Sequence, residues 1–268
     1  MKISTTNTTP DGTELETLLA LATTEPGRRP AFYRKLLESD VLVMVPDEVV
    51  VPNAQGDAVM RFVQWNRIDR LTAIPFFSSA RTFFEAIPQG AQCLVVDGLQ
   101  LLLLTRGAML HLNPFSEHNV VLMPEDVELL LASGTLGSSE RIKHTTERQL
   151  TTRDLSEPPA AMIEALTVLY SQAPNVKAAY LALVNGLYDS GQDSLLLGLE
   201  VDGDPEPIVN DTSAVIHDTY RDAYSIDIVE VWVDDEGNPT STFLPAQRFF
   251  DRRMASALSA PTTPKSLC

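Results

Sequence analysis

Three acidic side chains alternate along the chain at Asp202, Asp204 and Glu206. Alternating carboxylates can supply oxygen ligands to a divalent cation, but an EF-hand loop also needs a glycine at its sixth position and a distal glutamate. The stretch from 202 to 211 does not supply that pattern. We therefore expect no metal site there. Two interpretations stay open: solvated turn residues, or a docking face for a basic protein partner.

The same two interpretations apply to Asp234, Asp235 and Glu236, because acidic residues dominate this whole region. Residues 158–246 contain fifteen Asp and Glu side chains against Lys177 and Arg221, so they carry −13 of the chain's net charge of −16. Such a field repels nucleic acid and anionic membranes, and we expect neither as a partner. A basic protein is the partner that this charge favours.

Basic and aromatic side chains indicate a second contact surface. Four cations lie on one predicted helix: Arg28, Arg29, Arg34 and Lys35. Three more lie on a predicted terminal helix: Arg248, Arg252 and Arg253. Two alternatives stay open for these three, pairing with the acidic domain itself or joining the basic contact surface. Trp65 lies in a polar stretch, where a half-exposed ring can anchor an interface. The remaining aromatic residues that we considered are expected in the core: Phe76, Phe77, Phe83, Phe84 and Trp232.

No arrangement of residues predicts catalysis. The four histidines, at 111, 118, 144 and 217, are too scattered to supply the three or four ligands of a zinc site. The sequence has no strained Gly-x-Ser-x-Gly turn, no phosphate-binding loop and no dinucleotide fingerprint. Cys93 opens an apolar run and is expected to be a core residue. We expect no catalytic residue, no cofactor and no enzymatic activity.

The elements that must position these residues follow from hydrophobic spacing. Leu15, Leu18, Leu19 and Ala22 recur at helical intervals, with Asp11 or Thr13 as the cap, and a second helix follows to about Ser39. Strands are then expected at 41–45, 72–77 and 93–96, helices at 80–86, 99–106 and 125–132, and a hairpin at 109–112 with 120–122. Alternating strands and helices indicate a sheet covered by helices.

Beyond a polar stretch without apolar spacing, a second set of elements begins. It comprises a helix with Met162, Leu166 and Leu169 on one face, strands at 176–184, 194–201 and 225–233, and a helix at 207–220 between the last two. A short strand at 241–243 and a helix at 246–254 end the set. We therefore predict an α/β (α+β) protein with two mixed-sheet domains joined by a polar linker.

The predicted boundaries divide the chain into five parts. These are a disordered start (1–12), an N-terminal domain (13–133), a linker (134–157), an acidic C-terminal domain (158–254) and a disordered tail (255–268). The chain has two cysteines, a polar start without a secretory segment and no apolar run of transmembrane length. These features predict a cytoplasmic protein.

Five segments, in order, resemble the bacterial enhanced-serine-sensitivity protein family, SseB. They are residues 14–39 (ELETLLALATTEPGRRPAFYRKLLES), 73–79 (AIPFFSS), 157–166 (EPPAAMIEAL), 195–204 (LLLGLEVDGD) and 244–253 (LPAQRFFDRR). The resemblance implies an N-terminal and a C-terminal SseB domain. It brings no catalytic residues or cofactor, and it implies a regulatory or interaction protein in serine or sulfur metabolism.

The leading hypothesis is a non-enzymatic adaptor that binds a protein partner. Its candidate partner-binding residues are Asp202, Asp204, Glu206, Asp234, Asp235, Glu236, Arg28, Arg29, Arg34, Lys35 and Trp65. The alternatives are a small-molecule sensor for serine or a related amino acid, and an enzyme with an unrecognised site. The first requires a pocket and the second a cleft with a titratable residue of displaced pKa.

Overall fold

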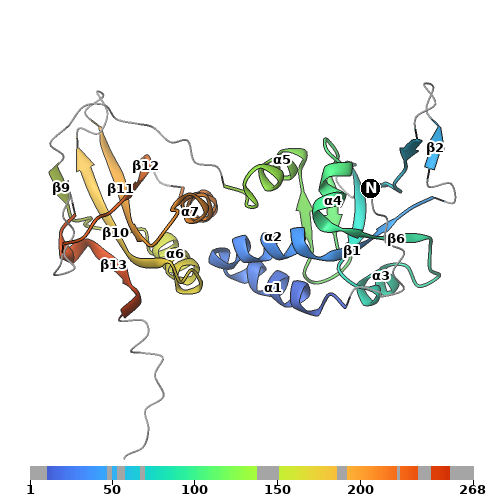
Figure 1. Ribbon diagram of the computed structural model, residues 1–268, viewed down its shortest axis with the longest axis horizontal. Helices are drawn as coiled ribbons and strands as arrows, with labels where there is room; N and C mark the ends of the chain where they lie inside the picture. The colour runs from blue at the N-terminus through green and yellow to red at the C-terminus, as the bar shows by residue number, and fades with distance from the viewer. Residues whose placement is uncertain are drawn as a thin grey trace, which may run out of the picture. The chain divides into compact units, whose positions relative to one another are not determined.

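The computed structural model describes residues 11–46, 50–52, 58–66, 70–137, 151–185, 192–221, 224–234 and 243–253. The chain divides into two compact units, Met1–Ser138 and Ser139–Cys268. Each unit is a mixed β-sheet with helices packed on it, so the predicted α+β class is confirmed (Figure 1). Residues 1–10 of the predicted disordered start (1–12), the whole predicted tail (255–268) and most of the predicted linker (134–157) lie outside the described residues.

The N-terminal unit combines short helices with short strands. In chain order they are α1 (Thr13–Thr24), η1 (Pro26–Arg28), α2 (Arg29–Glu38), β1 (Asp40–Met44), β2 (Val50–Pro52), β3 (Ala58–Met60), β4 (Trp65–Asn66), β5 (Thr72–Phe77), α3 (Ala80–Ala86), β6 (Cys93–Asp97), α4 (Gly98–Leu104), β7 (Leu110–Leu112), β8 (Val120–Leu122) and α5 (Pro124–Ser133).

The main sheet of this unit has the strand order β6-β1-β5-β7-β8, with β4 paired to β5. β5 and β7 are parallel, with Phe76 opposite Leu112, and the other pairs are antiparallel. Because β5 and β7 run in the same direction, the segments that follow Phe77 and Leu112 leave the sheet at the same end. That end carries the site described below.

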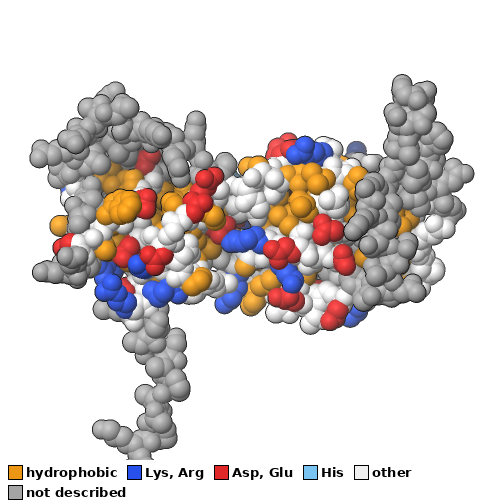
Figure 2. Space-filling view, in the orientation of Figure 1, with side chains coloured by type: hydrophobic (Ala, Val, Ile, Leu, Met, Phe, Trp, Pro, Cys, Tyr) orange, Lys and Arg blue, Asp and Glu red, His pale blue; other side chains and the backbone are white. Residues whose placement is uncertain are grey.

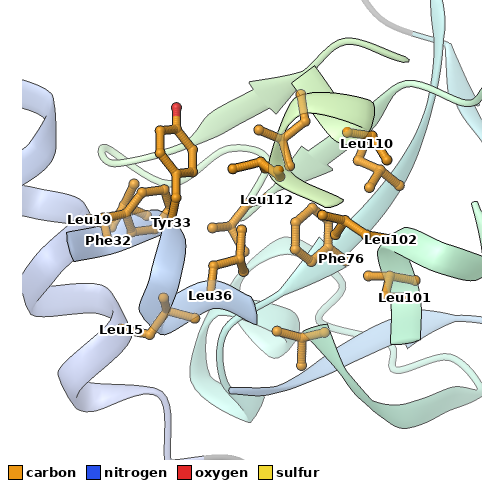
Figure 3. Packing of buried hydrophobic residues seen from close by; sticks show 14 of the residues in the cluster. Leu15, Leu19, Phe32, Tyr33, Leu36, Phe76, Leu101, Leu102, Leu110 and Leu112 are labelled. Atoms are coloured by element: carbon orange, nitrogen blue, oxygen red, sulfur yellow. The ribbon is translucent and has the colours of Figure 1, made fainter. Parts of the chain in front are cut away.

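The two faces of this sheet are covered differently, as the side-chain alternation of β1 requires. Val41 and Val43 join the larger core with residues of α1, α2, α4 and α5, in which Phe32 and Leu36 pack towards the sheet (Figure 3). Leu42 and Met44 point to the other face and pack with Phe77 and with Phe83 of α3. β5 contributes to both faces, because Phe76 belongs to the larger core and Phe77 to the smaller one.

The start of α1 differs from the expected side-chain cap. The N-cap residue is Gly12, with φ of 66° and no side-chain hydrogen bond to the helix, while Thr13 Oγ1 donates to Asp11 Oδ1 at 2.6 Å. A Cβ atom at Gly12 would lie 2.5 Å from the carbonyl oxygen of Ser78. Close contact with the β5–α3 turn, together with the left-handed backbone, explains why glycine occupies the cap.

The C-terminal unit contains β9 (Thr151–Arg153), α6 (Ala160–Gln172), β10 (Val176–Asn185), β11 (Asp193–Val201), α7 (Glu206–Thr219), β12 (Ile226–Glu230), η2 (Pro245–Gln247) and β13 (Arg248–Asp251). The strand order is β12-β11-β10-β13, and β9 also pairs with β10. β11 and β12 are parallel and joined through α7, and the remaining pairs are antiparallel. α6 and α7 lie on the same side of this sheet (Figure 1).

Each face of this second sheet is buried. On the helix side, Leu195, Leu197 and Leu199 pack with Met162 and Leu166 of α6. On the other side, Tyr180 and Leu196 pack with Val231 and Phe243. Gly198 lies under Phe243, where an added Cβ would come within 2.5 Å of the ring. Val231 and Phe243 therefore supply part of the cover of the face that lacks helices.

The expected terminal helix is wrong. Residues 248–251 form strand β13, which pairs with Ala178, Ala179 and Tyr180 of β10. Hydrogen bonding to the free side of β10 overrides the helical propensity of this arginine-rich segment. The structure also differs at β9, which pairs with β10 although its residues fall inside the predicted linker.

Candidate interaction surface

The cations expected to form a basic face of α2 are engaged with their own domain. Arg28 Nε lies 2.6 Å from Glu25 Oε2, Arg29 Nε donates to the Ala22 carbonyl at 3.2 Å, and Lys35 forms an ion pair with Glu14. Arg34 is exposed. On the face drawn in Figure 2, basic and acidic side chains are interspersed over α1 and α2. These contacts fasten α1 to α2. They give these cations a structural role that requires no partner protein.

Two members of the acidic triplet also have local partners. Asp202 Oδ1 lies 2.6 Å from Lys177 Nζ, across the β10–β11 pair. Asp204 Oδ1 accepts a hydrogen bond of 3.0 Å from the backbone N–H of Glu206, at the first turn of α7. A carboxylate in that position satisfies a helix N–H that has no partner within the helix. Within the described ranges, no cluster of three or more His, Cys, Asp or Glu side chains could hold a metal ion.

The second acidic group is only partly described. Asp234 is exposed, four residues beyond the end of β12, while Asp235 and Glu236 lie outside the described residues. The structure therefore does not bring the two acidic groups together in one described site.

Trp65 belongs to a row of aromatic rings on the α3 side of the N-terminal sheet. Neighbouring ring centroids are 5.3 Å apart for Phe84–Phe83, 5.3 Å for Phe83–Phe77, 6.3 Å for Phe77–Trp65 and 5.8 Å for Trp65–Phe115. Phe83 and Phe77 are buried and Trp65 is half-buried, whereas Phe84 and Phe115 at the ends of the row are 57% and 83% exposed. The row thus anchors two displayed phenylalanines to the core.

Phe115 is displayed at a conformational cost. Its φ is 71°, in the left-handed region that bulky side chains rarely adopt. A non-glycine residue held there costs on the order of 1 kcal/mol, which the surrounding structure must offset. A large apolar side chain that is both exposed and strained is not explained by folding, because it buries little surface. Its exposure and conformation make Phe115 a candidate contact residue.

Asn113 holds the Phe115 loop in place. Its side-chain Oδ1 accepts a hydrogen bond of 2.9 Å from the backbone N–H of Ser78, and its Nδ2 donates to Ser78 Oγ at 2.9 Å. Its backbone N–H donates to Phe76 O, and its own carbonyl accepts from Ser116 N at 3.0 Å. Asn113 is buried and has a φ of 49°. Asparagine suits this position because it tolerates the left-handed region and supplies both a donor and an acceptor.

Glu16 of α1 completes the polar cluster around this turn. Its Oε1 accepts hydrogen bonds from Ser78 Oγ at 2.8 Å and Ser79 Oγ at 2.7 Å, and its Oε2 pairs with Arg81. Burial of Glu16 raises its pKa, but the hydrogen bonds from Ser79, Ser78 and Arg81 outweigh burial and hold the pKa below its ordinary value. A carboxylate with a lowered pKa is a weaker base, so this arrangement does not activate either serine as a nucleophile.

Three residues expected in the core are exposed. Trp232 is 67% exposed just beyond β12, and Phe84 lies on the outer side of α3. Cys93 is exposed at the start of β6, the edge strand of its sheet, although partial burial raises the pKa of its thiol. These expectations rested on apolar residue type and, for Cys93 and Trp232, on position in an apolar run. Their exposure follows instead from their positions: Trp232 beyond a strand end, Cys93 on an edge strand and Phe84 on the outer side of a helix.

The polar cluster and Phe115 were missed by sequence reasoning. Ser78-Ser79 before a helix was a readable signal, because Ser79 is the N-cap of α3 and accepts from the Thr82 backbone N–H. Phe115 carried no such signal, since it is a single phenylalanine in a polar loop. Its significance depends on its backbone conformation and its exposure, which only the structure supplies.

These features define a class: a two-domain α+β protein with an exposed aromatic surface on its N-terminal domain. Comparison with known sequences identifies the family within this class. The profile of the SseB protein N-terminal domain matches residues 15–129, and that of the SseB protein C-terminal domain matches residues 145–252. The chain belongs to the SseB family, as its sequence resemblance implied.

Named relatives agree with this assignment. The chain is 34% identical over 251 residues to Protein SseB of Escherichia coli (strain K12), covering 91% of this chain and 94% of that protein. Protein SseB of Shigella flexneri matches with the same identity and coverage. No solved structure matches the chain. No helix in the described part of the chain is long and apolar enough to cross a membrane.

Proposed function

We propose that this SseB-family chain is a non-enzymatic adaptor whose N-terminal domain binds a protein partner through Phe115 and the adjoining Trp65 ring. The observation that carries the proposal is the 83% exposure of Phe115 in a left-handed conformation. Aromatic side chains are enriched among the residues that dominate binding energy at protein interfaces. The family resemblance suggests serine or sulfur metabolism as the setting for this partner.

The polar cluster beneath the loop supports a structural role rather than a catalytic one. The hydroxyl groups of Ser78 and Ser79 both donate to Glu16, whose pKa is lowered. Catalysis by a serine would require the opposite, a neighbouring base with a pKa near the working pH. The cluster instead fixes the turn at Ser78, which is hydrogen-bonded to Asn113. Asn113 in turn fixes the loop that contains Phe115.

The proposal is tested by quantitative capture of partners from the native bacterial lysate with Phe115→Ser. The matched control is Leu104→Ser, which changes another exposed apolar side chain on α4, a helix that packs on the opposite face of the sheet. Removal of an interface anchor usually costs at least 2 kcal/mol, so we expect about a thirty-fold loss of affinity for Phe115→Ser and little change for Leu104→Ser.

Two outcomes would contradict the proposal. One is equal capture by the parent chain and Phe115→Ser. The other is an equal loss in both variants, which would indicate non-specific apolar adhesion. Thermal unfolding of each variant accompanies the capture, so that a loss caused by unfolding is recognised as such.

A further inference from the structure

Strand β12 (Ile226–Glu230) ends the strand order of the C-terminal sheet and pairs only with β11 among the described residues. Two hydrogen bonds bracket this pair, from Leu195 N to Ser225 O and from Val231 N to Leu199 O, each of 2.8 Å. In a β-strand, successive residues direct their backbone groups to opposite sides. The odd-numbered residues therefore bond to β11, and Ile226, Ile228 and Glu230 direct their N–H and C=O groups outward.

The outward groups have no backbone partner among the described residues. None of the backbone hydrogen bonds outside the regular helices and strands involves Ile226, Ile228 or Glu230. The side chains of Ile226 and Ile228 pack against the core formed with α6 and α7, so packing holds the strand in place while its outer edge is unpaired among the described residues. A row of unpaired N–H and C=O groups on a fixed strand is a template for one more strand.

The side chains along this edge indicate which segment it would take. Glu230 and Asp234 are exposed and acidic. Residues 158–246 carry a net charge of −13, so their field favours a positively charged partner. Tyr224 and Trp232, 44% and 67% exposed, lie just before and just after the strand. Aromatic rings at the ends of an open edge can pack on apolar or cationic side chains of an added strand.

We propose that β12 binds an extended basic segment of another protein as an added β-strand. Main-chain hydrogen bonds to Ile226, Ile228 and Glu230 supply affinity, while Glu230, Asp234 and Trp232 select lysine or arginine. This inference is independent of the Phe115 surface, because it rests on other residues in the other domain. Either proposal can fail while the other stands.

The edge of the N-terminal sheet provides a comparison within the same chain. β6 is also an edge strand of five residues, and its hydrogen bonds to β1 leave Cys93, Val95 and Asp97 facing outward. Its single acidic residue, Asp97, accepts from Gln100 N at the start of α4. An open edge alone is therefore not specific in this protein. The acidic and aromatic flanks distinguish β12.

Charged side chains on an edge strand also protect against aggregation, and the test must separate the two roles. The probe is a fluorescent eight-residue peptide of alternating lysine and valine, added to the full chain. A glutamate–valine peptide of equal length tests charge, and a lysine–valine peptide with alternating N-methylated bonds tests backbone pairing. We expect binding of the first peptide only, with an affinity that falls as salt rises.

Hydrogen exchange read residue by residue shows where the peptide lies. With bound peptide, the amides of Ile226, Ile228 and Glu230 should become protected, whereas those of Asp227 and Val229 should change little because β11 already bonds them. Alternating protection identifies an added strand. Uniform electrostatic adsorption of a cationic peptide would not protect alternate amides. Binding without alternating protection would overturn the proposal.

Two variants at position 230 separate the contribution of the backbone N–H to peptide binding from that of the side-chain charge. Glu230→Pro removes one outward N–H and one charge, whereas Glu230→Gln removes the charge alone. We expect at least a ten-fold loss of affinity for the proline variant and a smaller loss for the glutamine variant. Val95→Pro, at an outward-facing position of β6, should leave binding unchanged. Equal affinity for Glu230→Pro and the parent chain, with both folded by thermal unfolding, would also reject the added strand.

Discussion

Asn113 and Ser78, thirty-five residues apart, form two hydrogen bonds of 2.9 Å: the backbone N–H of Ser78 donates to Asn113 Oδ1, and Asn113 Nδ2 donates to Ser78 Oγ. This contact joins the loop after β7 to the turn after β5. It is possible because β5 and β7 are parallel and adjacent. The geometry of the displayed Phe115 therefore depends on a buried pair rather than on the exposed loop itself.

Replacement of Asn113 should destabilise the N-terminal domain and weaken partner capture together. Asn113→Ala leaves the buried backbone N–H of Ser78 without its partner, at a cost of about 1–3 kcal/mol, and adds strain at a φ of 49°. Asn113→Gly loses the same hydrogen bonds without the strain, so it should be about 1 kcal/mol more stable than Asn113→Ala. Urea unfolding measures both, and equal stability of the two variants would contradict this account.

The Glu16 cluster should make stability depend on pH. The folded-state pKa of Glu16 lies below its ordinary value of 4.5, so the ionised form stabilises the folded state. That contribution is fully present above pH 4.5 and is lost as the pH falls through the lower, folded-state pKa. The difference in free energy of unfolding between the parent chain and Glu16→Gln should therefore shrink below pH 4.5.

Urea unfolding between pH 7 and pH 3 measures this difference. Ser79→Ala serves as the companion variant, because it removes one of the hydrogen bonds that lower the pKa. It should reduce the pH dependence without abolishing it. A difference between the parent chain and Glu16→Gln that stays constant over this range would show that the carboxylate contributes nothing through its charge.

Phe115→Gly should separate binding from folding. Glycine adopts a φ of 71° without strain, which recovers on the order of 1 kcal/mol, while loss of the ring contact with Trp65 costs about 0.5–1.5 kcal/mol. The two terms nearly cancel, so the free energy of unfolding should change little. Partner capture should nevertheless be lost. A large loss of stability would instead mean that Phe115 serves the fold.

The local sequence pattern was sufficient for short apolar segments bounded by turn residues. The expected helix at 80–86 lies at the residues of α3, and the expected strand at 72–77 is β5. It was insufficient for β13, because Phe249 and Phe250 are adjacent and fit helix and strand equally well. Only pairing with β10, almost seventy residues earlier, decides between them.

The candidate site was less predictable than the fold, and for a physical reason. Charged residues were chosen for their type, yet Arg28, Lys35 and Asp202 each have an ionic partner in their own domain. Glu25 lies only three residues from Arg28, but Lys35 and Asp202 meet their partners through tertiary packing, which a linear sequence does not display. Trp65 was selected for its half-exposed character, and its ring contacts that of Phe115.

The final prediction concerns Arg252, which directly follows strand β13 where a terminal helix was expected. Its guanidinium donates to the carbonyls of Tyr170, Ala173 and Val176, at the C-terminal end of α6 and the start of β10. The last carbonyls of a helix lack partners within the helix and carry a partial negative charge. One planar cation thus satisfies several of them at once.

Arg252→Met should therefore lower the free energy of unfolding by about 2–3 kcal/mol, because several charge-assisted hydrogen bonds are lost together. Arg252→Lys should be intermediate, since one ammonium group cannot match the fork of a guanidinium. The control is Arg253→Met, which changes the exposed neighbouring arginine and should have almost no effect. Equal stability of Arg252→Met and Arg253→Met would show that the α6 carbonyls are satisfied by water, and that β13 alone fastens this end of the chain to the sheet.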